Sequence, residues 1–171
     1  MRSGAVTPRK GSRTSPRKAK PAASAPHQAM VRSADLPWFP FLSEGVHLKL
    51  CKVNRATGEI ALLIRFDPGA RLGTHYYHSG VVAYAIRGKL REGDAQWVAG
   101  AGDVIFEPAG STHAFEPIGA DAAELFVHLS GAVEFRDEAG RTLFIENAET
   151  LHGRYLAHCA LHGLSPVDIT R

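Results

Sequence analysis

The chain contains 171 residues, with 20 Lys and Arg against 17 Asp and Glu, which gives a formal net charge of +3. Residues 1–32 hold eight basic residues and no acidic one, so residues 33–171 hold 12 basic against 17 acidic residues and carry −5. An acidic body argues against a nucleic-acid-binding domain, whose basic surface is spread over the fold. No apolar run approaches the ~18 residues of a membrane-spanning helix. With only two cysteines, Cys51 and Cys159, we expect a soluble cytoplasmic protein without a disulfide scaffold.

Residues 1–32 are rich in Pro, Ser, Ala, Lys and Arg and contain almost nothing that can be buried. Such a segment cannot offset the entropy cost of ordering, so we predict a disordered basic tail. Three interpretations of the tail stay open: a non-specific contact with nucleic acid or another polyanion, a targeting extension, and a translation start upstream of the native one at Met30. Residues 33–171 are then one domain, because their number suffices for a single core.

From residue 36 onward, short apolar segments alternate with turn residues. Residues 36–42 form an aromatic, Pro-rich lead-in that we expect to pack over a barrel mouth or a dimer seam. Strand character is found at residues 46–53, 59–66, 81–86, 90–98 with a turn inside, 103–106, 112–115, 124–129, 133–135 and 142–145. Many short strands at regular spacing, bounded by Gly, Pro, Asp or Asn, predict an all-β sandwich or barrel.

The last segment differs in kind, because residues 147–162 show helical periodicity. Leu151, Tyr155 and Cys159 fall on one helical face. Asn147 is a candidate N-cap, and Gly163 is a candidate C-terminal stop. We therefore predict one C-terminal helix, over about residues 147–162, packed on an otherwise all-β body.

The run from Gly102 to His113 has the form G, five residues, P, one residue, G, two residues, H, with Pro108 and Gly110 at the inner positions. Gly102 marks a turn, residues 104–106 a buried strand, and Pro108 to Gly110 a tight turn that returns the chain along the next strand. A histidine fixed in this way directs a ring nitrogen into the barrel. His113 is therefore a candidate metal ligand, with a structural histidine satisfied by a backbone carbonyl as the alternative.

A second run, from Gly69 through His75 to Gly88, precedes this motif. Together the two runs resemble the cupin superfamily, whose first motif is G, five residues, H-x-H, three or four residues, E, six residues, G. Its second motif is the G-P-G-H pattern just described. The resemblance covers residues 36–146 and, through the segments THYYHSG, FEPAGSTH and FVHLSG, extends to the acetylacetone-cleaving and 2,4′-dihydroxyacetophenone dioxygenase-like group. It implies a cupin barrel, which is a double-stranded β-helix or jelly roll.

Two ligand positions of the first motif are changed in this chain. The second histidine of the motif falls on Tyr77, and its glutamate falls on Val81 when counted back from Gly88. The dioxygenase-like group is expected to bind iron through three histidines, so the absence of the glutamate is tolerable. On a regular strand, His75 and Tyr77 face one way and His78 faces the other. A one-residue β-bulge would turn His78 to the side of His75.

We therefore predict a metal site formed by His75, His78 and His113. Three neutral imidazoles can bind Fe(II), Zn, Ni or Cu, and the resemblance implies Fe(II) among these. Three protein ligands also leave coordination positions open for substrate and O₂. A rival ligand set is His75, Tyr77 and His113, and a barrel without any metal is the third interpretation.

Other candidate residues surround this site. His128 is a candidate catalytic proton donor lining the pocket, with a structural histidine as the alternative. Glu107 is a candidate catalytic residue that orients the distal N–H of a ligand, with a solvated loop position as the alternative. Five aromatic side chains are expected to line an apolar substrate pocket: Tyr77, Tyr84, Phe106, Phe115 and Phe126.

The resemblance implies a non-haem Fe(II) dioxygenase that cleaves a carbon–carbon bond in a small diketone or hydroxyketone. Its partners would be a small carbonyl substrate and O₂. Open sheet edges in such barrels are often paired across a two-fold axis, so we also expect a homodimer. A non-catalytic ligand-binding or regulatory cupin and a metal-dependent isomerase or hydrolase stay open as alternatives, because a fold does not fix a function.

Overall fold

The computed structural model describes residues 1, 30–93 and 97–170. A short 3-10 turn, η1 (Ser33–Asp35), precedes the strands, and a helix, α1 (Ala148–Leu161), follows them. The strands are β1 (Phe39–Pro40), β2 (Val46–Asn54), β3 (Glu59–Phe66), β4 (His75–Tyr77), β5 (Val81–Arg87), β6 (Lys89–Glu92), β7 (Val98–Gly100), β8 (Val104–Glu107), β9 (Thr112–His113), β10 (Phe115–Pro117), β11 (Ala123–Ser130), β12 (Val133–Arg136) and β13 (Thr142–Glu146). In the described part of the chain, no helix is long and apolar enough to cross a membrane.

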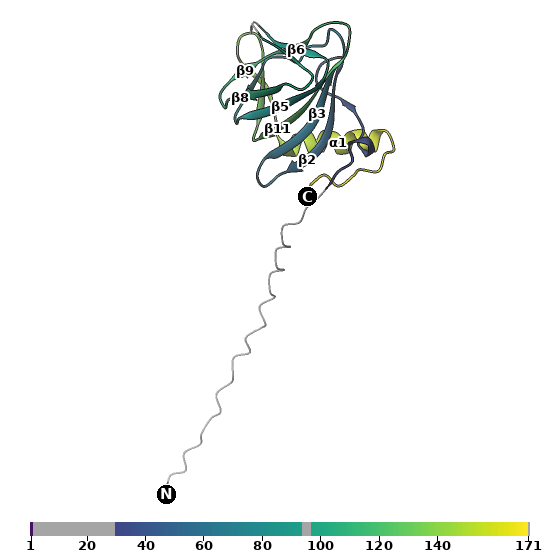
Figure 1. Ribbon diagram of the computed structural model, residues 1–171. Coiled ribbons are helices and arrows are strands. Elements are labelled where there is room, and N and C mark those ends of the chain that lie inside the picture. The colour runs from purple at the N-terminus through teal and green to yellow at the C-terminus, as the bar shows by residue number, and fades with distance from the viewer. Residues whose placement is uncertain (2–29, 94–96, 171) are drawn as a thin grey trace.

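The strands form a small antiparallel barrel (Figure 1). One sheet has the strand order β1-β2-β3-β11-β5-β8, a second has the order β13-β12-β4-β9, and a third has the order β10-β6-β7. The core lies inside the barrel, because alternate side chains of each strand point inward. The mostly β barrel with a C-terminal helix agrees with the fold predicted from the sequence.

Two glycines of the sequence motifs are required by the backbone path. Gly88, between β5 and β6, has a φ of +73°, and a Cβ built on it would lie 2.5 Å from the carbonyl oxygen of Ala122. No other residue type fits that position without a backbone shift. Gly110, in the turn between β8 and β9, has a φ of +85°. These glycines let the chain reverse at the points where the strands of the site begin or end.

The C-terminal helix begins at the predicted N-cap. The Asn147 side chain accepts hydrogen bonds from the backbone N–H groups of Glu149 (2.9 Å) and Thr150 (3.1 Å). The hydroxyl of Thr150 accepts one from the backbone N–H of Asn147 (2.8 Å), which completes a capping box. The helix buries the predicted face that includes Leu151 and Tyr155.

A buried ion pair also ties α1 to the barrel. Glu146, the last residue of β13, is only 2% exposed. Its carboxylate accepts hydrogen bonds from Arg154 Nε (2.7 Å) and Thr150 Oγ1 (2.6 Å), both on α1. A second pair, between Arg55 and Glu149 (3.0 Å), connects the same helix to the β2–β3 turn but lies on the surface.

The structure adds two strands that the sequence pattern does not predict, β1 and β4. Both are short, and β4 contains His75. The aromatic lead-in packs on the helix and the cavity: the ring centroid of Phe39 lies 6.5 Å from that of Tyr155, and Phe41 lies 5.9 Å from Phe135. Residues 2–29 of the predicted tail and residues 94–96 fall outside the described residues.

Candidate functional site

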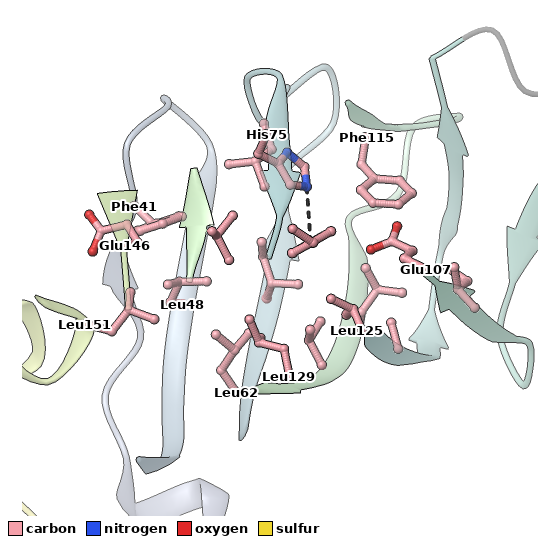
Figure 2. Close-up of a pocket in the computed structure, with 18 of the residues that line it drawn as sticks. Phe41, Leu48, Leu62, His75, Glu107, Phe115, Leu125, Leu129, Glu146 and Leu151 are labelled. Carbon is pink, nitrogen blue, oxygen red and sulfur yellow. Dashed lines mark hydrogen bonds between the residues drawn. The ribbon is translucent and has the colours of Figure 1, made fainter. Parts of the chain in front are cut away.

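The barrel encloses a cavity of about 70 Å³. Apolar side chains form most of its wall, and four polar ones interrupt it: His75, Tyr77, Glu107 and Glu146. Figure 2 shows His75 and Glu107 directed into the same space, with Glu146 and Leu151 on the opposite side. The apolar wall includes Phe41, Leu48, Leu62, Ile64, Phe66, Leu72, Val81, Ala83, Ile105, Phe115, Leu125, Val127, Leu129, Val133, Phe135 and Leu151.

His75 is the most buried of the polar groups, with an exposed fraction of 0%. It lies on β4 directly opposite His113 of β9. Its Nδ1 donates a hydrogen bond to the carbonyl oxygen of Gly73 (2.9 Å), so its Nε2 carries a lone pair. That nitrogen lies 3.1 Å from the hydroxyl of Tyr77. Burial lowers the pKa of His75 to about 4, so the ring is neutral at physiological pH.

Tyr77 and Glu107 occupy the same end of the cavity as His75. Burial, together with the nearby Glu107 carboxylate, raises the pKa of Tyr77 well above its ordinary value, which disfavours a phenolate. Glu107 is 5% exposed, and its Oε1 is buried without a hydrogen-bond partner. Burial, and next the negative charge of Glu92, raises the pKa of Glu107 to about 8. Both shifts favour the uncharged forms of these two side chains.

His113 completes the group from β9. Its Nδ1 lies 2.5 Å from Glu92 Oε1 and 3.7 Å from Glu107 Oε1, and its Nε2 lies 2.5 Å from Ser111 Oγ. Sequence reasoning missed Glu92 and Ser111. Ser111 stands two residues before His113, and side chains two residues apart on an extended chain lie on the same side, so this contact could have been predicted. Glu92 reaches the site through the pairing of β6 with β10, and no local signal in the sequence indicates that pairing.

The structure does not bring His78 to His75 and His113. Strand β4 pairs with β12 without a register shift and ends at Tyr77, so the predicted bulge is wrong. His78 instead faces outward, with a side chain 45% exposed and its Nε2 3.2 Å from Glu134 Oε2. The reason is the regular alternation of β4, which turns His75 and Tyr77 inward.

Four further residues lie on the outer face of the six-stranded sheet, so the pocket or catalytic positions predicted for them are wrong. Tyr84 and Phe106 are 46% and 74% exposed, and Phe126 is 37% exposed. The side chain of His128 is 44% exposed and contacts Glu59 Oε1 at 3.3 Å. Their strands bury the alternate residues instead. Tyr77 and Phe115 do line the cavity.

The donor set fits a divalent transition metal in its chemistry. His75 offers an unprotonated Nε2, His113 a second imidazole, and Glu107 a buried carboxylate oxygen that lacks a partner. Among the residues that the structure describes, no three His, Cys, Asp or Glu side chains are already gathered as a set of ligands. His75 contacts the Tyr77 hydroxyl, and His113 contacts Glu92 and Ser111, so metal binding requires these histidine side chains to change partners.

The jelly-roll barrel, with His75 in its cavity wall and His113 opposite His75 on the neighbouring strand, has the architecture of a cupin. Residues 26–142 match the family of ChrR cupin-like domains, and the chain belongs to this family. A comparison with curated proteins found no match.

Solved structures share the fold. An RmlC-like cupin protein from Ralstonia eutropha is 28% identical, with a TM-score of 0.80, over 85% of this chain and 95% of that chain. An acetylacetone dioxygenase from Acinetobacter johnsonii is 16% identical, with a TM-score of 0.70, over 81% of this chain and 97% of that chain. A proposed acetylacetone dioxygenase from Methylibium petroleiphilum is 20% identical, with a TM-score of 0.72, over 78% and 97%. These last two likenesses concern the fold alone.

Proposed function

We propose that this cupin is a metal-dependent dioxygenase that cleaves a carbon–carbon bond of a small diketone or hydroxyketone. The observation that supports the proposal most is the polar end of the cavity, where the Nε2 lone pair of His75 and the unpartnered carboxyl oxygen of Glu107 share an otherwise apolar enclosure. The reaction type is taken from the acetylacetone dioxygenase that shares the fold.

His75 and His113 would hold the metal. Fe(II) is the expected ion, with Zn, Ni or Cu as alternatives, because imidazole nitrogens suit all four. When bound, Fe(II) supplies Lewis-acid polarisation of the substrate oxygens and one-electron chemistry with O₂. Gly73 fixes the His75 ring by accepting from Nδ1, and Glu92 fixes the His113 ring by accepting from its Nδ1, as partners of ligand histidines commonly do.

The remaining wall of the cavity selects and orients the substrate. Phe115 stacks on His113, with ring centroids 6.0 Å apart and an interplanar angle of 7°. Leu72 and Phe135 bound the same space, so an alkyl or aryl ketone would replace water there. The volume of about 70 Å³ favours a substrate of a few non-hydrogen atoms, and a larger one requires side-chain movement.

Metal analysis of protein purified without a chelating tag tests this proposal. We expect about one iron per chain, its loss in H75A, and its retention in H78A. H78A is a matched control, because His78 lies three residues away and faces outward. Consumption of O₂ should follow addition of acetylacetone to the iron-loaded protein. Sub-stoichiometric metal that H75A and H113A leave unchanged would refute the proposal.

A non-catalytic ligand-binding cupin is the second candidate. The observation that favours it is that His75 and His113 are both engaged in hydrogen bonds within the protein, with their ring centroids 6.3 Å apart. Under this alternative, a small apolar ligand stabilises the metal-free protein in a thermal shift assay, and O₂ consumption stays at the background rate.

A further inference from the structure

The outer face of the six-stranded sheet carries a continuous apolar surface on β11, β5 and β8, which are neighbours in that order (Figure 1). Tyr84 on β5 pairs with Phe126 on one side and with Val104 on the other. Two residues earlier on β5, Val82 pairs with Phe106. Directly opposed side chains of antiparallel strands lie on the same face and contact each other. We call the following exposed side chains the outer apolar patch: Val82, Tyr84, Ile86, Val104, Phe106 and Phe126.

Strands β5 and β8 are apolar on both faces, as strands with both faces covered are. An antiparallel strand with one face in water instead alternates between apolar and polar residues. Every position of β5 from 81 to 86 is apolar, although its outward side chains are 40–46% exposed. On β8, Val104 and Phe106 face outward and are 50% and 74% exposed. The sequence of these strands therefore predicts a cover over their outer face.

On the β2 and β3 side of the same face, the chain supplies its own cover. Lys49 faces this side, because it is aligned with Phe126 across Leu63. The ring of Trp38, in the lead-in, lies 4.9 Å from Lys49 Nζ and 5.1 Å from the guanidinium carbon of Arg65. Lys49 is consequently only 9% exposed. In the described part of the chain, no segment covers the outer apolar patch in this way, and its side chains stay 37–74% exposed.

The outer apolar patch is large enough for an interface between two copies of the chain. With about 150–250 Å² for a fully exposed residue of this size, the exposed fractions correspond to roughly 450–700 Å² of apolar area per copy. The largest apolar patch of a typical monomer measures about 300–600 Å². Stable interfaces bury about 1,200–2,000 Å² in total, and two copies of the patch supply roughly 900–1,400 Å² before a polar rim is added.

The charges beside the patch favour a second copy of the chain over a membrane surface. On the same face, Arg87 pairs with Glu124 at 3.0 Å, and His128 lies 3.3 Å from Glu59. This rim carries both signs, so two copies related by a two-fold axis can set an acid of one against a base of the other. A surface that binds anionic lipids carries an excess of Lys and Arg instead. Two-fold dimers, which bring identical surfaces together, are the commonest homo-oligomers.

We propose that the outer apolar patch is the interface of a homodimer, in which two six-stranded sheets pack face to face about a two-fold axis near Tyr84. Tyr84 is central, because β5 lies between β11 and β8 and Tyr84 lies between Val82 and Ile86 on that strand. Packed sheets are about 10 Å apart and their side chains interdigitate. This arrangement differs from the pairing of open edges expected from the sequence. It does not depend on the proposed function, because the patch and the cavity lie on opposite faces of β5.

Sedimentation equilibrium over a range of protein concentrations tests the interface. The wild-type protein should form a dimer with a dissociation constant below about 10 μM. Y84E should raise this constant more than about tenfold, because it places a charge at the desolvated centre of the interface. L143E is the matched control, since Leu143 is 61% exposed on β13 of another sheet, and it should change the constant less than about threefold. Circular dichroism verifies that each variant is folded.

A charge swap gives the sharper test. Y84E and Y84K should each dimerise weakly, because like charges meet across the axis, whereas an equimolar mixture of the two should associate at least about tenfold more tightly than either. A wild-type protein that stays monomeric at about 100 μM, or a mixture no tighter than its components, would overturn the proposal. Equal dissociation constants for Y84E and L143E would overturn it too. So would a monomer that binds phosphatidylglycerol–phosphatidylcholine vesicles through Tyr84, since a lipid surface would then be the occupant.

Discussion

The ion pair between Glu146 and Arg154 should contribute much of the free energy that holds α1 against the barrel. Glu146 is 2% exposed, so R154A leaves a buried carboxylate with Thr150 as its remaining side-chain donor. Breaking a fully buried pair costs about 3–5 kcal/mol. Because the Arg154 side chain is 46% exposed, water reaches its place, and we expect a loss of about 1.5–3 kcal/mol. For a domain of this size that corresponds to a fall in Tm of about 5–10 °C.

Thermal unfolding followed by circular dichroism measures this loss. R55A is the matched control, because Arg55 and Glu149 form a second pair to the same helix with side chains 56% and 67% exposed. That pair should change stability by less than about 0.5 kcal/mol. Adding E146Q to R154A should recover part of the loss, since a neutral amide costs less to bury than a carboxylate. Equal melting temperatures for R154A and R55A would refute the reasoning.

Three further predictions concern pH, assembly and the helix cap. In chelator-treated protein, the folded state holds one proton more than the unfolded chain at Glu107 between pH 4.5 and about 8, so stability falls as pH rises through this range. Below pH 6.5 the lowered pKa of His75 has the opposite effect on stability and offsets this fall. Between pH 6.5 and 8 the free energy of unfolding, measured with urea, should therefore fall by about 2 kcal/mol. E107Q should abolish this fall. The outward face of β5, β8 and β11 carries Phe106, which is 74% exposed, and we expect a second copy of the chain to cover this face. F106E should then raise the dimer dissociation constant more than about tenfold in analytical ultracentrifugation. A wild-type protein that sediments as a monomer would contradict this expectation. N147A should cost about 1 kcal/mol in thermal unfolding, while N147S, which keeps a capping oxygen, should cost less.

The barrel was predictable because its strands are short, apolar and separated by strong turn residues. The helix was predictable for a local reason as well, since Asn147 and the buried face of residues 151–159 are contiguous in the sequence. The orientation of β5 and β8 was harder to predict, because these strands are apolar on both faces. In β5, Ala83 and Ala85 face inward and Tyr84 faces outward, so the small residues fill the limited interior and the aromatic ones cover the surface.

In the candidate site, too, some residues could be predicted from local sequence and others could not. His75 and His113 stand in motifs whose turns fix them locally, and the sequence indicates both. The placement of His78 depends on the pairing of β4 with β12, and its partner Glu134 is 56 residues away. The contact between Glu92 and His113 depends on the pairing of β6 with β10. Such contacts are decided by the packing of distant strands, which no local pattern encodes.

Gly88 is a residue of the first motif that the fold requires, independently of any reaction. A side chain at this position would collide with the backbone of Ala122 and Ala123, whatever the barrel binds. The glycine is thus a steric requirement of the corner where β5 passes into β6, and a barrel that binds no metal at all would still need it. In a motif of this kind, the glycines identify the architecture, and only the side chains that face the cavity identify the reaction.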